Sequence, residues 1–167
     1  MTKAESKVID FIKKHILLFL LVAVTIIAIF LRVCGMDFQS DDFNSFLNSW
    51  WSIIKLNDFT GLATQVGNYN IPYQIIIYLM TLLPLNALYA YKIVSIIFDF
   101  VLAISTAMLA YSFAKNNRRL KAILTYSAVL LSATVIFNSS FWAQCDSIYT
   151  SFIILAIPVS YTHLTLP

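Results

Sequence analysis

The sequence predicts an all-α protein, a polytopic transmembrane helical bundle, and three observations support this prediction. The chain of 167 residues is 60% hydrophobic and 11% charged, with a mean hydropathy of +0.80, which is too apolar and too poor in charge for an ordinary soluble domain. Its apolar residues gather in stretches that approach the length of a bilayer crossing, about 30 Å. Its basic residues gather in two clusters at the ends of such stretches. We therefore expect a multi-pass protein of the cell membrane.

The first apolar stretch, residues 16–31, carries no charged residue and would cover about 24 Å as a helix. This is somewhat short of a crossing, so we expect a helix over about residues 15–36, with Arg32 snorkelling to the interface. A cleaved signal peptide is the alternative, because Lys13 and Lys14 precede the apolar run. No A-x-A-like cleavage site follows, which favours an uncleaved anchor.

Further membrane helices are expected over residues 88–114, 122–141 and 148–157. The last of these covers only about 15 Å before the composition changes, so we expect a membrane helix that is cut short. Residues 159–167 back-translate as a sequence that looks like a transposase-type sequencing adapter read in frame. We therefore expect residues 158–167 to be an adapter-derived tail, and residues 1–157 to be the amino-terminal part of a larger domain that is inactive alone.

The two basic clusters predict the topology. They consist of Lys3, Lys7, Lys13 and Lys14, and of Lys115, Arg118, Arg119 and Lys121. The positive-inside rule places both in the cytoplasm, together with the amino terminus. Only one stretch between them can then cross, and residues 71–85 are too short for this, with Pro72 and Pro84 near their ends. We expect an interfacial or re-entrant segment there, in an outer loop over 37–87. If it crossed instead, the second cluster would lie outside.

The expected topology places several acidic residues in one outer compartment. They are Asp37, Asp41, Asp42, Asp58 and Asp146. Apolar residues recur at helical spacing over 43–54, and the pair Trp50 and Trp51 is typical of a helix in the headgroup region. We therefore expect an amphipathic interfacial helix directly after the acidic turn Ser40-Asp41-Asp42.

The acidic turn has a structural and a functional interpretation. One aspartate would serve as the N-cap of the helix that follows. Because a helix needs only one cap, the other carboxylate is left to accept the proton of an attacking hydroxyl or to hold a divalent cation. Asp41 and Asp42 are therefore the candidate catalytic residues, and which of them is the base stays open.

Polar residues also interrupt the apolar pattern at 138–149 and at Asp99. The first segment is either a plain loop or part of a site, and Asn138 begins an N-glycosylation acceptor very close to the membrane. Asp99 lies near the middle of an expected crossing, so we expect it to pair within the bundle rather than to act in catalysis. Arg32 and Lys92 are the cations nearest the outer acids. Either would bind a phosphate or snorkel.

The net charge of +3 is spread in short clusters at membrane edges, so no nucleic-acid partner is expected. Cys34 and Cys145 would both lie on the outer side. They could pair, but two separate small apolar side chains are the expected state.

Three motifs carry a family resemblance. They are Asp37-Phe-Gln-Ser-Asp-Asp-Phe43 with Trp50-Trp51, Gly67-Asn-Tyr-Asn-Ile-Pro-Tyr73, and Trp142-Ala-Gln-Cys-Asp-Ser-Ile-Tyr149. This combination, over about residues 15–157, resembles the GT-C fold of membrane glycosyltransferases. The nearest likeness is to bacterial relatives of the mannosyltransferase that adds the second mannose of GPI anchors.

The resemblance implies transfer of a sugar, mannose in the nearest relatives, from a polyprenyl-phosphate donor to an acceptor hydroxyl on the outer face. Asp41 or Asp42 would be the base. The residues expected to bind substrate are Asp146, Gln144, Arg32, Lys92 and Tyr69. Membrane lipids are expected partners, no metal ligand is assigned, and a divalent cation is the one cofactor left open.

Two other functions remain at this point. In a transporter or lipid carrier, Asp99 and Lys92 would line a path through the membrane and the outer acids would be incidental. The second alternative function is that of a non-catalytic subunit of envelope polysaccharide assembly. No internal repeat of the kind common in transporters is visible in the sequence.

Overall fold

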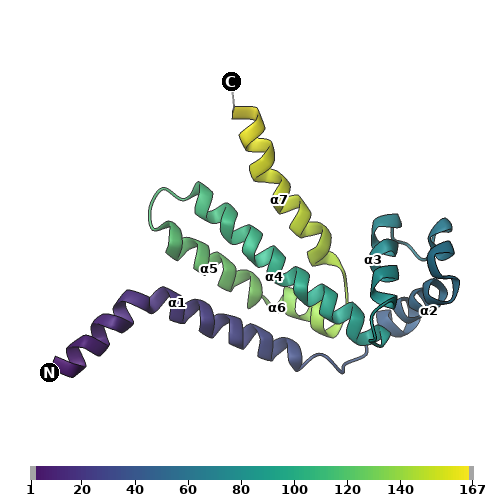
Figure 1. Ribbon diagram of the computed structural model, residues 1–167, viewed down its shortest axis with the longest axis horizontal. Helices are drawn as coiled ribbons and strands as arrows, with labels where there is room; N and C mark the ends of the chain where they lie inside the picture. The colour runs from purple at the N-terminus through teal and green to yellow at the C-terminus, as the bar shows by residue number, and fades with distance from the viewer. Residues whose placement is uncertain (1–2, 166–167) are drawn as a thin grey trace.

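The computed structural model describes residues 3–165, and every regular element in that range is helical (Figure 1). The prediction of an all-α chain is confirmed for this part. The longer helices are α1 (Lys3–Val33), α4 (Ala87–Phe113), α5 (Arg118–Leu130) and α7 (Asp146–Thr165). The shorter elements are η1 (Phe43–Leu47), α2 (Asn48–Asn57), η2 (Asp58–Ala63), α3 (Ile71–Thr81), α6 (Ala133–Ile136) and η3 (Phe137–Phe141).

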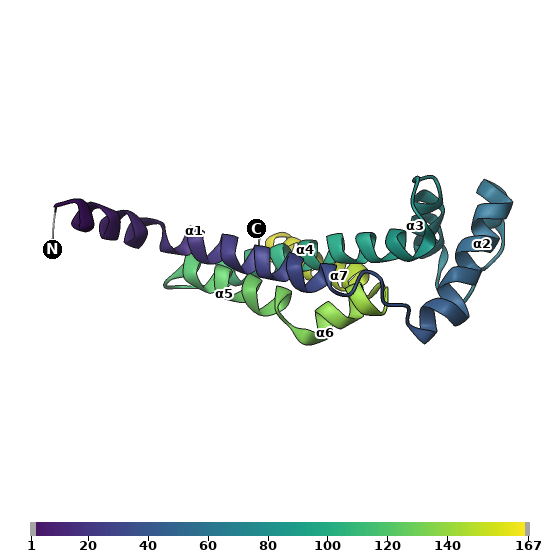
Figure 2. The same ribbon diagram turned by 90° about the horizontal axis from the view of Figure 1, so that it is seen from below.

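Helices α1, α5 and α4 form one layer, in which α5 packs against both α1 and α4. Helix α7 also packs against α4 and diverges from it at an angle (Figures 1 and 2). Asn86 begins α4 by accepting a hydrogen bond from the Tyr89 N–H at 2.9 Å, which satisfies one of the free amides of the first turn. Small residues bring α1 and α4 close to their neighbours. Ala28 and Ala103 are fully buried, next to Tyr126 and Leu130 of α5.

Two helices, α1 over Glu5–Val33 and α4, are long and apolar enough to cross a membrane. A third crossing results if α5 and the following Ala133–Phe141 count as one span, although they are bent by 51°. Large apolar side chains on α1 point outward, with Ile26 61% and Phe30 65% exposed. Such an outward apolar surface is typical of a helix that faces lipid or further protein. Helix α3 would cover only about 16 Å, so it cannot cross.

The short elements η1, α2, η2 and α3 gather at the end of the layer where α4 begins (Figure 2). The expected helix over 43–54 is confirmed, as η1 and α2. Its apolar face packs on protein, however, because Trp51 and Ile54 are buried against α3 and the Tyr91 ring of α4. Another face of this region carries exposed apolar side chains, such as Phe46 and Leu56. The expected contact with lipid headgroups would involve these side chains.

Several boundaries differ from the expectations. Helix α1 begins at Lys3 instead of about residue 15, and the expected helix over 122–141 is broken at Leu131 and Ser132. Helix α7 begins at Asp146 and continues across Pro158 to Thr165, so most of the expected tail is helical here. Residues 166 and 167 lie outside the described residues.

A buried ion pair joins α1 to α4. The Arg32 Nε donates to Asp99 Oδ2 at 2.9 Å, and the two side chains are 1% and 0% exposed. The Arg32 Nη1 also donates to the carbonyls of Ala28 and Leu130, at 3.1 and 3.0 Å. The expected pairing of Asp99 is therefore confirmed. The expected snorkelling of Arg32 is wrong, because a partner within the bundle spares the guanidinium the cost of reaching water.

Two further elements meet at the same aspartate. The hydroxyls of Ser139 in η3 and Ser147 in α7 each donate to Asp99, both at 2.5 Å. The carboxylate thus accepts bonds from three other elements, which satisfies most of its lone pairs. This network fixes α7 and η3 to the layer formed by α1, α4 and α5.

Candidate active site

Clusters of acidic and of basic residues lie at opposite ends of the helical layer. The end formed by η1 to α3 and by the start of α7, which we call the acidic end, carries Asp37, Asp41, Asp42, Asp58 and Asp146. The turn between α4 and α5, which we call the basic end, carries Lys115, Arg118, Arg119 and Lys121 (Figure 1). This is the separation that the charge pattern predicts. The acidic end therefore holds most of the candidate residues.

Ser40 caps the helix that follows the acidic turn. Its Oγ accepts a hydrogen bond from the Phe43 N–H at 3.1 Å and donates to the Trp142 carbonyl at 3.4 Å. The expectation that one aspartate is the cap is wrong, because the short serine hydroxyl already fills that role. Asp41 and Asp42 both lie in the first helical turn, where the helix dipole favours negative charge.

Asp42 is held by two later segments of the chain. The Gln144 Nε2 donates to Asp42 Oδ2 at 2.9 Å, and the Tyr69 hydroxyl donates to Gln144 Oε1 at 3.4 Å. One amide thus joins the acidic turn to the segment before α3 and the segment before α7. All three residues were predicted to belong to the site, and the structure brings them together.

Tyr69 remains a neutral donor in this chain of hydrogen bonds. Burial raises the pKa of its phenol well above the ordinary value, and the nearby Cys145, Asp146 and Asp42 raise that pKa further. A phenol next to two carboxylates cannot ionise without bringing a third negative charge to the same place. Its proton is therefore kept for Gln144.

Asp41 is exposed, and no other residue in the described part of the chain makes a hydrogen bond or ion pair with its carboxylate. It faces a pocket of about 300 Å³ lined by Phe38, Gln39, Ser40, Asp41, Asp42 and Trp142. A second pocket, of about 370 Å³, is lined by Asp42, Phe46, Leu47, Trp50, Asn68, Tyr69 and Gln144. Because Asp42 belongs to both, the two pockets adjoin at the acidic turn.

Asp146 lies at the start of α7 and binds a different partner. Its Oδ2 accepts a hydrogen bond from Asn138 Nδ2 at 2.7 Å. It is close enough to Tyr69 to raise the pKa of that phenol, yet it makes no hydrogen bond to Asp42 or Gln144. Asp146 is therefore at the edge of the site rather than in its centre.

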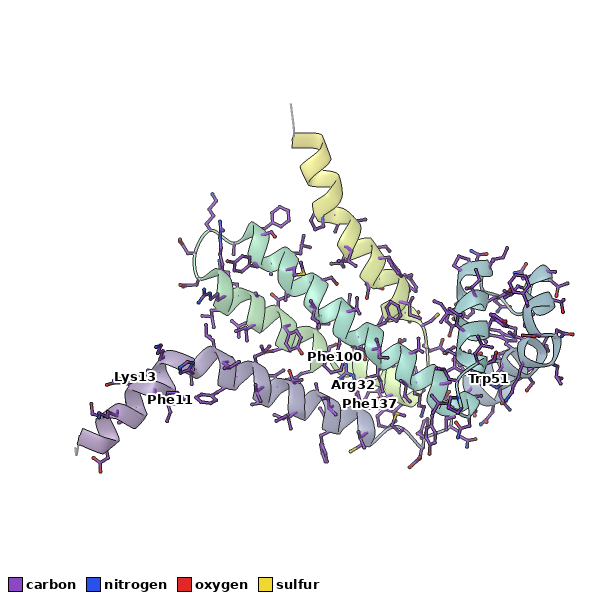
Figure 3. The ribbon with its side chains drawn as sticks, viewed as in Figure 1. Phe11, Lys13, Arg32, Trp51, Phe100 and Phe137 are labelled. Carbon is purple, nitrogen blue, oxygen red and sulfur yellow. The ribbon has the colours of Figure 1, made fainter. Side chains whose placement is uncertain are left out.

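Arg32 and Lys92 are not placed to meet a substrate phosphate. Arg32 lies within the helical layer beside the Phe100 ring, far from Trp51 in the cluster of short elements (Figure 3). Lys92 is fully buried, and its Nζ donates to the carbonyls of Gly35, at 2.7 Å, Met36, at 3.0 Å, and Phe38. Lys92 thus binds the carbonyls that follow α1, where a cation is favourable, and holds the backbone just before the acidic turn.

The cysteines are separate. Cys34 is exposed and Cys145 is buried, and both are free thiols, as expected. Several residues that line the two pockets were not predicted as site residues, among them Trp142, Trp50 and Asn68. All three belong to the three sequence motifs, and their ring or amide character was the signal that could have identified them.

Gly67 allows the segment that carries Tyr69 to pass close to α2. Its φ is +73°, and a Cβ there would lie 2.2 Å from Cε2 of Trp50. We expect Gly67→Ala to destabilise the protein by more than the 1–2 kcal/mol (roughly) of a left-handed alanine alone, because Trp50 must also move. Thermal unfolding in detergent would measure this.

Gly61→Ala is the matched control. The nearest atom to a Cβ at Gly61 is the Asn57 Cβ at 3.2 Å, and its φ is not in the left-handed region. Its unfolding temperature should stay much closer to that of the wild type. Equal losses in the two variants would show that the contact between Gly67 and Trp50 is not needed.

No group of three histidine, cysteine, aspartate or glutamate side chains is arranged to hold a metal ion within residues 3–165. The acidic turn contributes only two carboxylates, those of Asp41 and Asp42, as possible metal ligands. A hard divalent cation held by two carboxylates would take its remaining oxygen ligands from water or from a substrate phosphate.

No protein-family model, curated protein or solved structure matches the chain.

Proposed function

We propose that this chain belongs to a multi-pass membrane glycosyltransferase of the GT-C type, which moves a sugar from a polyprenyl-phosphate donor to an acceptor hydroxyl at the outer face. The observation that carries the proposal is the acidic turn. There, an unpartnered carboxylate, Asp41, stands beside a second one, Asp42, that is held in place by Gln144. Two open pockets meet at this pair. Such convergence of polar groups in a concave site is typical of substrate binding.

Asp41 is proposed as the general base, because its oxygens are free to reach an acceptor hydroxyl. The acceptor proton passes to Asp41 while the acceptor oxygen forms a bond to the anomeric carbon of the sugar. The bond between that carbon and the phosphate oxygen breaks, and the polyprenyl phosphate leaves with the electron pair. The anomeric carbon is inverted, through a transition state like that of inverting sugar hydrolysis.

Asp42 is proposed to bind and orient the acceptor instead. One of its oxygens is occupied by the amide of Gln144 at 2.9 Å, so it is a weaker candidate for taking up a proton. The Gln144 amide is fixed in turn by the neutral phenol of Tyr69. An ordered chain of this kind keeps the geometry of the site from changing when substrate binds.

The polyprenyl chain is proposed to lie in an apolar groove of about 630 Å³ between α4, α5 and α7. Thr150 lines this groove and lies one helical turn after Asp146, at the acidic end. A lipid tail in the groove would therefore bring its phosphate toward the acidic turn. The cation for that phosphate is not Arg32 or Lys92, since both are buried and bonded.

The alternative of a transporter is less well supported. It requires Asp99 and Lys92 to line a path through the membrane. Both side chains are fully buried, Asp99 binds Arg32 and two serines, and Lys92 binds backbone carbonyls. These partners are typical of structural charges within a bundle.

The direct test of the proposed function uses membranes that contain the complete gene product. Radiolabelled mannose is supplied on a polyprenyl phosphate. Its transfer to an acceptor is measured as the loss of label from the donor. The expected result is a rate of transfer higher than the rate measured with membranes that lack the protein. Absence of transfer with mannose and with other hexoses on the same carrier would contradict the proposal.

The proposed topology predicts which ends of the helices an impermeant thiol reagent can reach. In a Cys34→Ala background, which removes the exposed thiol, we expect Gln39→Cys and Tyr149→Cys to be labelled on intact cells, because both positions are exposed at the acidic end. Asn117→Cys, between α4 and α5, should be labelled only after permeabilisation.

Ser147→Cys is unsuitable as a probe, because Ser147 is buried and bonded to Asp99. Labelling of position 117 but not of position 149 on intact cells would show that the two ends are reversed.

A further inference from the structure

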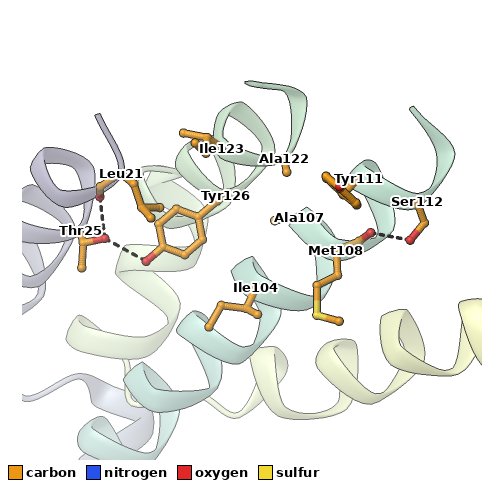
Figure 4. A pocket seen from close by; sticks show the side chains of 10 residues that line it. All are labelled: Leu21, Thr25, Ile104, Ala107, Met108, Tyr111, Ser112, Ala122, Ile123 and Tyr126. Carbon is orange, nitrogen blue, oxygen red and sulfur yellow. Dashed lines mark hydrogen bonds between the residues drawn. The ribbon is translucent and has the colours of Figure 1, made fainter. Parts of the chain in front are cut away.

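An apolar pocket of about 490 Å³ lies toward the basic end, between α1, α4 and α5 (Figure 4). Its walls include Leu21 and Thr25 of α1, Ile104 and Met108 of α4, and Ile123 and Tyr126 of α5. The pocket is at the opposite end of the layer from the acidic turn, so it takes no part in the proposed transfer.

Three of the four hydroxyl groups in the wall of the pocket, those of Thr25, Tyr126 and Ser112, are already bonded. Thr25 Oγ1 donates to the Leu21 carbonyl at 2.8 Å and lies 3.0 Å from the Tyr126 hydroxyl, and Ser112 donates to the Met108 carbonyl at 2.9 Å (Figure 4). The fourth hydroxyl, that of Tyr111, belongs to a residue that is 44% exposed beside Arg118, so the rest of the wall offers a ligand only apolar contacts. The occupant that this surface favours is therefore hydrocarbon.

The pocket opens sideways, toward the surface that the lipid of a bilayer would cover. Ile104 is 50% exposed, Met108 60% and Tyr111 44%. All three belong to α4, one of the two helices long and apolar enough to cross a membrane. A lipid chain can therefore enter from the side without any helix having to move.

The basic end adjoins this pocket. Ala122 lines the pocket, and Arg118 lies one helical turn before it on α5. The Tyr111 ring, also in the wall, lies 5.9 Å from the Arg118 guanidinium. The pocket and the positive charges are thus parts of one surface.

The positive charge of this end is not neutralised by the chain itself. Within the described residues, Lys115, Arg119 and Lys121 have no carboxylate partner. The sequence contains no aspartate or glutamate between Asp99 and Asp146. A phosphate accepts bonds from several such cations, so an anionic headgroup can supply the counter-charge at this surface.

We propose that this surface binds an anionic phospholipid, with an acyl chain in the pocket and the phosphate on Arg118, Arg119 and Lys121. From Ser112 to Ile104 the pocket extends about 12 Å along α4, and Arg118 lies about 6 Å beyond Ala122 along α5. A single lipid can therefore reach both the charges and the pocket. The net negative headgroup distinguishes this lipid from a zwitterionic one of the same chain length.

The test uses the full chain in nanodiscs of phosphatidylcholine that contain a trace of phosphatidylglycerol with a photoreactive acyl chain. After irradiation, cross-linked peptides are mapped by mass spectrometry. Cross-links should concentrate on Ile104, Met108 and Ile123. They should be competed by unlabelled phosphatidylglycerol and not by extra phosphatidylcholine.

Two variants separate the charges from the pocket. Each cation near an anionic headgroup contributes about fivefold in affinity, so Arg118→Gln with Arg119→Gln should weaken competition on the order of 25-fold. Lys55→Gln, at the acidic end, is the control and should have no effect. Ala122→Phe, which fills the pocket, should remove the cross-links, whereas Ala133→Phe at an exposed position should not.

Three results would overturn the proposal. One is equal competition by the anionic and the zwitterionic lipid. Another is unchanged cross-linking in Ala122→Phe when its unfolding temperature matches that of the wild type. The third is an absence of lipid cross-links on the pocket residues in nanodiscs that hold two copies of the chain, which would make a second copy the occupant. None of these results bears on sugar transfer, so the two proposals can fail separately.

Discussion

Replacing Asp41 with asparagine is expected to lower the rate of sugar transfer by about 10²- to 10⁴-fold, the usual contribution of a general base. The change removes the charge and the proton acceptor but keeps the shape of the side chain. Because the Asp41 carboxylate makes no hydrogen bond within the described chain, folding should be unaffected. Release of the polyprenyl phosphate by membranes that contain each variant of the complete gene product measures the effect.

Asp42→Asn should have a smaller effect, expressed in the Michaelis constant for the acceptor more than in the turnover rate. An asparagine oxygen at this position still accepts the bond from Gln144, so the geometry is kept while the charge is lost. Asp58→Asn is the matched control, since Asp58 is also exposed at the acidic end but lines neither pocket of the site. Full activity in Asp41→Asn, in Asp42→Asn and in the double variant would rule out the assignment of the acidic turn.

Replacing Asp99 with asparagine is expected to lower the free energy of unfolding by about 3–5 kcal/mol, because it leaves the buried charge of Arg32 without its partner. For a chain of this size, the loss corresponds to a decrease in the unfolding temperature on the order of 10 °C. Circular dichroism during heating in detergent measures it. The same loss is expected for Arg32→Met, which leaves the carboxylate unpaired.

The double variant Arg32→Met with Asp99→Asn tests the physical reason. Removing both charges ends the cost of burying an unpaired ion, so stability should return toward that of the wild type. Asp58→Asn, in an exposed side chain, should stay within about 0.5 kcal/mol of the wild type. A double variant as unstable as the sum of the two single variants would show that the pairing is not what stabilises this part of the bundle.

Much of the fold could be predicted, because long apolar stretches leave few alternatives. The helix expected over 88–114 differs from α4 by one residue at each end, as Asn86 provides a clear cap. The break at Leu131 and Ser132 was not predicted. No proline or glycine marks it, and the sequence around it stays apolar, so the bend depends on packing between distant segments.

The site was predicted in part. Asp42, Gln144 and Tyr69 meet because three separate loops end at the same side of the helical layer, and charge clusters are enough to indicate that side. The cap was misassigned because Ser40 and the aspartates are all good caps, and only the backbone geometry decides between them. Arg32 was expected near the surface because its partner lies 67 residues away, a distance at which sequence spacing carries no information.

That separation matters during synthesis of the protein. Arg32 is synthesised 67 residues before Asp99, so we expect the guanidinium to have no counter-ion when α1 first inserts in the proposed topology. An unpaired arginine near the lipid is costly. We therefore expect helix α1 to take a temporary position, at the translocation channel or shifted toward water, until α4 arrives. The ion pair would then make insertion of the two helices a single cooperative event, and a ribosome that stalls before α4 would leave a chain with a poorly anchored first helix.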